Sequence, residues 1–199
     1  MKFSSASNPE KTRLRTEEEL QNQAIGLAQL RNILDGLQIP YFIGGGTLLG
    51  IIRDNDFIAW DWDVELCFRF EDIYVHRKTL LENLKKHGFS LENYNRSKAN
   101  FKITAGKFGT AYELLTYRKN GEFRQRMRSK MPDKFFSEGN YVTLRGEKYQ
   151  SLNPPEEYLA YNYGDWKTPM RTADRSSYTT SHSRMKITLL DRLRNIFGI

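Results

Sequence analysis

The stretch IGGGTLLGIIRDNDFIAWDWDVELCF, residues 43–68, decides how the chain is expected to fold. Three glycines precede a short apolar segment, and acids then follow at every second position, Asp61, Asp63 and Glu65. From Trp62 onward, apolar residues alternate with these acids. Because successive side chains of a β-strand point to opposite faces, the pattern predicts a strand with an apolar face in the core and three carboxylates together on the other face.

The remaining sequence predicts helices and further strands around this segment. Apolar residues at helical spacing, with proline and glycine at the ends, predict helices over residues 17–37, 71–86 and 154–164. Short alternating or apolar runs predict strands at residues 41–43, 62–70, 89–94, 100–104, 111–117, 141–144 and 147–150. We therefore expect the α+β class, with a mixed sheet flanked by helices.

The composition is that of one folded domain with an anionic partner. The chain has 199 residues, 39% of them hydrophobic, which is enough to bury a core without metal or disulfide staples. Its one cysteine, Cys67, excludes an intramolecular disulfide, and no apolar run marks an export signal or a spanning helix, so we expect a cytoplasmic protein. The net charge of +7 favours nucleic acid, a nucleotide-phosphate donor or an acidic membrane surface as partner. The basic span of residues 118–130 is typical of a solvated face, with an anionic donor or glycan as the alternative ligand.

The chain is expected to divide into three parts. Residues 1–16 are polar and basic and predict a flexible arm, residues 17–182 predict a single catalytic domain, and residues 183–199 predict a basic amphipathic helix at the C-terminus. A helix of this kind can lie on an anionic membrane as a peripheral contact, and it can equally dock on the domain or pair with a second copy. Both interpretations stay open from the sequence.

The strand acids form a candidate metal site. Carboxylates two residues apart on a strand lie about 6.6 Å apart along the chain, and their side chains can converge on a hard cation. This favours Mg2+ or Mn2+ over zinc, because the three histidines are scattered and no Cys/His pair has ligand spacing. Glu113, in a predicted neighbouring strand, is the best candidate to complete the ligand set. The alternative is a solvated edge strand whose charges discourage aggregation.

The glycine turn is a candidate phosphate site. A bare glycine turn that opens a helix can present backbone N–H groups to a phosphate. Glycines also occur at turns because they can adopt positive φ angles, so the turn alone does not decide between phosphate binding and a purely conformational role. Taken together, a strand, a glycine turn, a short helix and a strand with paired acids form the layout of a nucleotidyltransferase.

Two blocks resemble a known family. The segment GGGTLLGIIRDNDFIAWDWDVEL resembles the signature of the LicD and fukutin group, whose usual form is close to GGTLLGxxRxxxFIPWDDDxD, within the polymerase-beta-like nucleotidyltransferase superfamily. A second block, NPPEEYLAYNYGDWKTP at residues 153–169, resembles the later motif of the family. The two motifs occur in the family's order, and the resemblance covers the chain from about residue 20 to residue 172.

The resemblance implies a function and the residues that perform it. It implies transfer of phosphocholine or a polyol phosphate from a CDP-linked donor to a sugar of a cell-surface glycan or glycoconjugate, free or lipid-linked, with Mg2+ or Mn2+ as cofactor. By position, the acids that carry over as metal ligands and catalytic groups are Asp61, Asp63, Glu65 and Glu113. The residues expected to bind substrate are Gly45, Gly46, Thr47, Arg53, Tyr163 and Trp166. The last two would stack on a base or a sugar, with packing as the alternative.

Three positions depart from the family pattern: Trp62 replaces the middle Asp, Glu65 replaces an Asp, and Ala59 replaces a proline. Strand alternation points Trp62 away from the metal face, so we expect little catalytic loss from it. Two rival functions remain, a non-catalytic family member acting as a glycan-binding or assembly partner and a nucleic-acid nucleotidyltransferase. Nucleic acid is not expected as a partner, because no RNA-binding motif is present and the aromatics do not interleave with the basic span.

Overall fold

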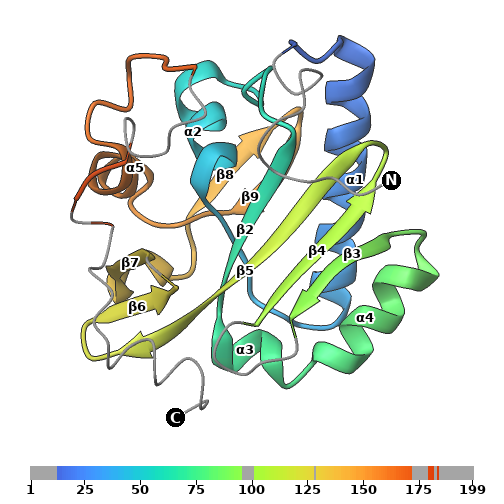
Figure 1. Ribbon diagram of the computed structural model, residues 1–199. Helices are drawn as coiled ribbons and strands as arrows, with labels where there is room; N and C mark the ends of the chain where they lie inside the picture. The colour runs from blue at the N-terminus through green and yellow to red at the C-terminus, as the bar shows by residue number, and fades with distance from the viewer. Residues whose placement is uncertain (1–12, 96–100, 128, 172–178, 182, 184–199) are drawn as a thin grey trace.

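A mixed, curled β-sheet with helices on both faces forms the body of the protein (Figure 1). The computed structural model describes residues 13–95, 101–127, 129–171, 179–181 and 183. This architecture confirms the expected α+β class.

The helices are α1 (Glu17–Gly36), α2 (Gly45–Asp54), α3 (Phe70–Tyr74), α4 (Arg77–Lys86) and α5 (Pro155–Tyr163), with a 3-10 helix, η3, at Asp133–Phe136. The strands are β1 (Phe42–Ile43), β2 (Asp63–Arg69), β3 (Ser90–Asn95), β4 (Lys102–Lys107), β5 (Thr110–Asn120), β6 (Phe123–Arg126), β7 (Ser129–Pro132), β8 (Tyr141–Leu144) and β9 (Glu147–Gln150).

The strand order of the main sheet places β2 and β5 side by side at its centre. The order is β1-β2-β5-β4-β3, β6 pairs with the end of β5 and with β7, and β8 and β9 form a separate hairpin. β2 and β5 are parallel, whereas the other described strand pairs of the main sheet are antiparallel. The register pairs Glu65 with Glu113, so both side chains project from the same face of the sheet.

The core lies between the other face of the sheet and α1. A capping box fixes the start of α1: the N–H of Glu19 donates to Thr16 Oγ1, and the N–H of Thr16 donates to the Glu19 carboxylate. On the sheet, Tyr112 Oη donates to the carbonyl of Gln23 in α1 at 2.9 Å. The β2 residues on the same face are fully buried, namely Val64, Leu66 and Phe68. The β2 acids between them therefore project from the opposite face.

Some expected elements differ from the structure. The expected single helix over residues 71–86 is wrong, because α3 and α4 are separate. The apolar pattern does not mark this break, since Ile73, Leu80 and Leu84 are all buried at spacings that one helix would also have. The strand expected at residues 100–104 is β4, which starts and ends later in the chain.

The expected terminal segments are only partly described. Residues 1–12 of the arm and residues 184–199 of the C-terminal helix lie outside the described residues. Arg15, at the end of the expected arm, is buried. Within the described parts of the chain, no helix has the length and apolar character needed to cross a bilayer.

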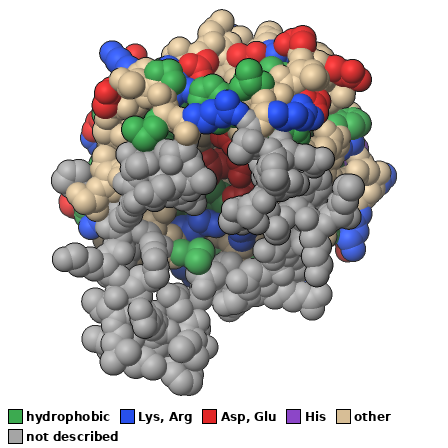
Figure 2. Space-filling model, turned by 45° about the horizontal axis from the view of Figure 1, so that its top comes forward, with side chains coloured by type: hydrophobic (Ala, Val, Ile, Leu, Met, Phe, Trp, Pro, Cys, Tyr) green, Lys and Arg blue, Asp and Glu red, His purple; other side chains and the backbone are tan. Residues whose placement is uncertain are grey.

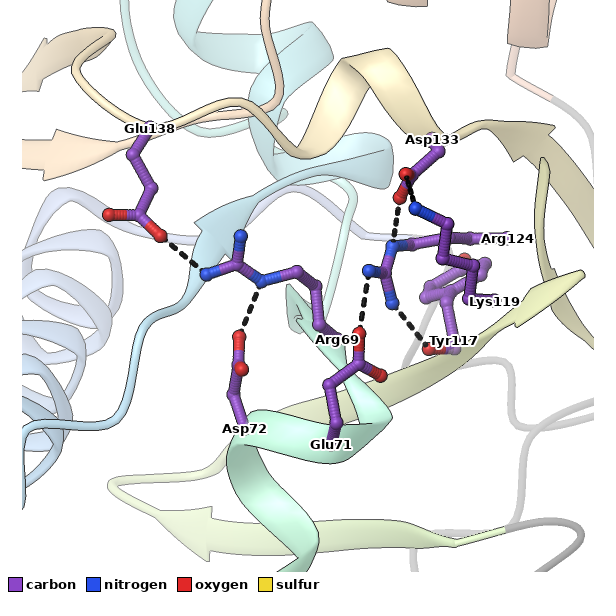
Figure 3. A network of polar contacts seen from close by, with 8 residues as sticks. All are labelled: Arg69, Glu71, Asp72, Tyr117, Lys119, Arg124, Asp133 and Glu138. Atoms are coloured by element: carbon purple, nitrogen blue, oxygen red, sulfur yellow. Dashed lines mark hydrogen bonds and ion pairs between the residues drawn. The ribbon is translucent and has the colours of Figure 1, made fainter. Parts of the chain in front are cut away.

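Two arginines tie the end of the central sheet to the elements around it (Figure 3). Arg124 of β6 donates to Asp133 of η3 at 2.5 Å and to Glu71 of α3 at 2.6 Å. Lys119 also pairs with Asp133, and Arg69 makes a similar bridge from the end of β2. The Arg124 side chain is only 4% exposed, so the expectation of a solvated basic face is wrong at this position.

Candidate active site

The predicted acids lie where the start of β2 meets the first turn of α2. A Cβ at Gly46 would lie 2.5 Å from Asp61 Oδ2, and a Cβ at Gly45 would lie 1.8 Å from Glu65 Oε2. Gly45 also has a φ of +55°, a conformation that side chains disfavour. Glycine at both positions therefore lets two carboxylates approach the helix directly.

Glu65 is hydrogen-bonded to the glycine turn. Its Oε2 accepts the N–H of Gly46 at 2.7 Å, and its own N–H donates to Thr47 Oγ1 at 2.9 Å. The carboxylate thus caps the N-terminus of α2, where negative charge is favourable. The N–H of Gly45 donates to Tyr158 Oη at 3.0 Å. The N–H groups of Gly45 and Gly46, which the sequence assigned to a phosphate, therefore have protein acceptors in this structure.

Asp61 and Asp63 form a carboxylate pair beside the turn. Their carboxylates lie next to one another, and the backbone N–H groups of Trp62 and Asp63 also lie close to the Asp61 carboxylate. Burial raises the pKa of Asp61 above its ordinary value, and the charge of Glu65 raises this pKa further. A cation at the pair would oppose both effects, since an opposite charge favours the ionised carboxylate.

Glu113 extends the acidic face onto β5. It lies beside Glu65 in the register, and its Oε1 accepts from Lys102 Nζ of β4 at 2.6 Å. Both side chains of this ion pair are about a quarter exposed, at 24% for the lysine and 22% for the acid. The structure therefore brings the fourth predicted acid to the same face and gives it a basic partner from the next strand.

The donor set fits a hard divalent cation at Asp61 and Asp63. Among the described residues, no three His, Cys, Asp or Glu side chains are arranged to hold a metal ion by themselves. Glu65 is directed to the glycine turn and Glu113 to a lysine. Mg2+ is usually bound through one or two carboxylates, with substrate phosphates and water completing its shell. Two adjacent carboxylates are such a set.

The other predicted contacts lie on α2, at the end of α5 and just after α5. Arg53, in the last turn of α2, donates to both carboxylate oxygens of Asp54, at 2.8 and 2.7 Å. Tyr163 ends α5 and Trp166 follows it, and both side chains are partly buried against the core. α5 packs against α2. Contact of these three residues with a substrate stays a prediction.

Two contacts of the site were not predicted from the sequence. No sequence signal marks the hydroxyl of Tyr158 as the acceptor for the glycine turn. A Cβ at Gly50 would lie 2.6 Å from the carbonyl oxygen of Asp56 and 2.8 Å from the backbone nitrogen of Ile58. The signal for this contact was present, since a glycine inside an apolar helix often marks a close backbone approach.

Acidic and basic side chains lie close together on one face of the molecule. Figure 2 shows Asp and Glu side chains near the centre of this face, with Lys and Arg side chains close to them. Mixed charge of this kind suits a ligand that carries phosphate groups and a metal ion together.

Comparisons with known proteins agree with these observations. The family model described as LicD/FKTN/FKRP, nucleotidyltransferase domain, matches residues 38–152, which include the four acids. The chain is 48% identical over 40 residues to lipopolysaccharide cholinephosphotransferase LicD of Haemophilus influenzae. It is 42% identical over 41 residues to ribitol 5-phosphate transferase FKRP of Homo sapiens. These matches cover 20% and 21% of this chain but only 12% and 8% of the two relatives.

A solved structure shares the fold. The solution structure of the antibiotic-resistance factor ANT(2'')-Ia matches with a TM-score of 0.53 at 16% sequence identity, over 80% of this chain and 82% of that one. At this identity the likeness concerns the fold alone. The family model, in contrast, matches more than half of the chain, and this chain therefore belongs to the LicD family.

Proposed function

We propose that the protein transfers a substituted phosphate, phosphocholine or a polyol phosphate, from a CDP-linked donor to a sugar hydroxyl of a cell-surface glycan or glycoconjugate. Membership of the LicD family supports transfer of phosphate-containing groups in glycan modification. The names of the two relatives, a cholinephosphotransferase and a ribitol 5-phosphate transferase, support the kind of group transferred.

The observation that carries the proposal is the pair of adjacent carboxylates, Asp61 and Asp63, of which Asp61 lies beside the first turn of α2. Asp63 begins β2, which pairs with β5 along its length and with β1 only at Leu66 and Cys67. Asp61 and Glu65 lie against the first turn of α2 and not along an open strand edge, which favours a site over a solvated edge strand. Carboxylates that lie close together on one face of a sheet repel one another unless a cation or a proton neutralises them. Their clustering here therefore favours a functional role for these acids.

In this mechanism the protein supplies ligands, a support and a base. Asp61 and Asp63 would hold Mg2+ or Mn2+, which when bound neutralises charge on the donor diphosphate and the leaving CMP. Glu65 holds the first turn of α2 against β2 and so keeps the pair in place. One of the four acids would accept, on a carboxylate oxygen, the proton that the sugar hydroxyl loses as it attacks phosphorus and CMP leaves. Lys102 holds Glu113 on this face through the 2.6 Å contact.

Calorimetric titration tests the proposal. CDP-choline, CDP-ribitol and CDP-glycerol are each titrated, with and without Mg2+, into the wild type, Asp63→Asn and the control Asp35→Asn. Asp35 is an acid of α1 whose side chain is 60% exposed and lies 3.9 Å from Arg31, so its loss leaves the site intact. We expect the wild type and the control to bind one donor in a Mg2+-dependent way, and Asp63→Asn to lose this binding.

The donor that binds is then used in a transfer assay. Asp61→Asn and Asp63→Asn should stay folded, because neutralising one carboxylate of a cluster removes repulsion, and both should lose turnover. Near-wild-type transfer by either variant would show that the pair does not hold the metal. If the folded wild type binds none of the three donors, these donors are excluded, and other nucleotide donors are titrated next. A non-catalytic glycan-binding function becomes the better explanation if those do not bind either.

A further inference from the structure

The chain segment before α1 lies against the loop that carries the acids. The backbone N–H of Arg15 donates to the carbonyl of Ala59 at 2.7 Å. The guanidinium of Arg15 lies 4.4 Å from the ring centroid of Trp62, and that of Arg13 lies 4.8 Å from the same ring. This segment therefore contacts the residue that separates Asp61 from Asp63.

The side chain of Arg15 is held rigidly. The residue is only 5% exposed. One guanidinium nitrogen donates to Gln23 of α1 and to Thr110 Oγ1 at 2.9 Å, and the other donates to the carbonyl of Gly109 at 3.1 Å. A buried arginine with partners on a helix and at a strand turn has one available conformation, so it can serve as a fixed surface for the ring that stacks on it.

The stacking contact is what orients the Trp62 ring. Its indole N–H is buried and has no hydrogen-bond acceptor in the described part of the chain. The carbonyl of Trp62 accepts from the N–H of Ala111 only at 3.4 Å, and the ring belongs to the residue between two carboxylates that project the other way. Rotation about the side-chain bonds of Trp62 would leave Asp61 and Asp63 in place, but a displacement of the Trp62 backbone would move both, because they are its neighbours in the chain. Arg15 restrains this backbone at two points, through its N–H bond to the carbonyl of Ala59 and through the stacked ring.

We propose that Arg15 is a positioning residue of the active site, which holds Trp62 and through it sets the direction of the Asp61–Asp63 pair. The inference rests on the proposed function for what the pair does. It extends the site beyond residues 38–152, the part that the family model matches, because Arg15 lies before them. It also gives a role to Trp62, which stands where the family motif has an acid: the ring is the side chain on which Arg15 acts.

The test compares Arg15→Met with a matched control, Arg31→Met. Arg31 is also on the α1 side of the molecule, lies 5.3 Å from the Tyr149 ring and pairs with Glu147 at 2.7 Å, but it contacts none of the site acids. Each variant loses an arginine that stacks on a ring, but Arg15 is 5% exposed and the Arg31 side chain is 19% exposed, so their losses of stability need not be equal. Urea unfolding of both variants is therefore measured first, and the two are compared under conditions in which both are fully folded. Arg15→Lys, which keeps the charge but not the fork of donors, serves if Arg15→Met does not fold.

Two quantities are measured without any donor. The first is Mn2+ affinity, followed by the electron paramagnetic resonance signal of the free ion, and the second is amide hydrogen exchange of peptides that cover residues 57–64. We expect Arg15→Met to weaken Mn2+ binding about tenfold, as for other residues that orient metal ligands. Exchange over residues 57–64 should be about tenfold faster, since the loop opens more often. Arg31→Met should leave both unchanged.

A double substitution tests whether the effect passes through Trp62. If it does, Arg15→Met combined with Trp62→Ala should bind Mn2+ no more weakly than Trp62→Ala alone. Losses that multiply, or an Arg15→Met protein that behaves like Arg31→Met in both measurements, would overturn the inference. If the wild type binds no Mn2+, the metal part of the proposed function fails, and hydrogen exchange still decides whether Arg15 positions the loop.

Discussion

The backbone N–H of Gly45 donates to Tyr158 Oη across 3.0 Å, although the two residues lie 113 positions apart in the chain. Gly45 belongs to the first motif and Tyr158 to the second, on α5. The phenol is buried, with 2% of the residue exposed, so water does not replace this contact. The later motif therefore supports the glycine turn through this hydrogen bond, and this role does not depend on whether its aromatic residues also bind a substrate.

Tyr158→Phe should lower both stability and donor binding. The substitution leaves the N–H of Gly45 buried without an acceptor, which costs about 1–3 kcal/mol in the free energy of unfolding, measured with urea. The control is Tyr161→Phe, because the Tyr161 hydroxyl donates to the carbonyl of Lys130 at 3.2 Å from the same helix, away from the turn. Equal loss of donor binding in both variants would show that α5 acts only through packing.

Gly50→Ala should displace the loop that leads to the acids. The added methyl group would lie 2.6 Å from the carbonyl oxygen of Asp56, a backbone atom that cannot rotate away, so we expect a loss of about 1–3 kcal/mol and weaker metal binding. Gly36→Ala is the matched control, because a Cβ there has no neighbour within 4 Å among the described residues. It should be neutral or stabilise by up to about 1 kcal/mol. A neutral Gly50→Ala would mean that the loop adjusts freely.

The sequence predicted the central strand well because its signal is local. Alternation from Trp62 to Phe70 identified β2, its buried face and the common face of Asp63 and Glu65. The register that sets Glu113 beside Glu65 joins segments that are distant in the chain. Glu113 could still be predicted as a fourth site acid, because it is an acid among mainly apolar residues of its strand.

The partners of the polar side chains could not be predicted in the same way. Residue type shows that Glu65 is an acid, but only the fold shows that its carboxylate reaches the N–H of Gly46. Likewise a basic span is solvated on average, and the burial of Arg124 follows from where Glu71 and Asp133 lie in space. Such contacts depend on tertiary structure and leave no periodic pattern in the sequence.

Arg124→Met should destabilise the protein far more than Arg69→Met. Arg124 is 4% exposed and pairs with Glu71 and Asp133, whereas Arg69 is 23% exposed. Removing one member of a buried ion-pair network leaves charges without compensation and costs about 3–5 kcal/mol, while more exposed pairs contribute about 1 kcal/mol or less. Urea unfolding of both variants checks the difference, and equal losses would show that the network is solvated.

Stability should fall in acid partly through Glu19. The hydrogen bond from Arg13, and then that from the Thr16 N–H, lower the pKa of Glu19 from 4.5 to about 2. A carboxyl group whose pKa is lower in the folded protein stabilises it above the unfolded pKa, and this contribution is lost as pH falls from about 4.5 towards 2. Glu19→Gln should therefore be less stable than wild type at pH 6, by about 1 kcal/mol or less because solvent screens the pair, and the difference should vanish near pH 2.

Glu18→Gln, in the same first turn of α1, is the control for this experiment. It removes a charge from the same turn and leaves the capping box of Thr16 and Glu19 intact, so it should change stability little. A Glu19→Gln difference that is constant between pH 6 and pH 2 would contradict the assignment of this acid-sensitive step to Glu19.

The role of Glu65 can be decided by two substitutions that separate charge from reach. Glu65→Gln keeps an oxygen acceptor for the N–H of Gly46 but removes the charge, and Glu65→Asp keeps the charge but shortens the side chain by one methylene.

If Glu65 supports the first turn of α2, as its 2.7 Å hydrogen bond indicates, Glu65→Gln should retain most of the stability and donor binding. Asp should lose about 1–3 kcal/mol, because the Gly46 N–H loses its acceptor. If Glu65 is instead a metal ligand, the order reverses: Asp keeps Mg2+-dependent donor binding and Gln abolishes it. Urea unfolding and calorimetry on the same two proteins therefore distinguish a structural cap from a ligand.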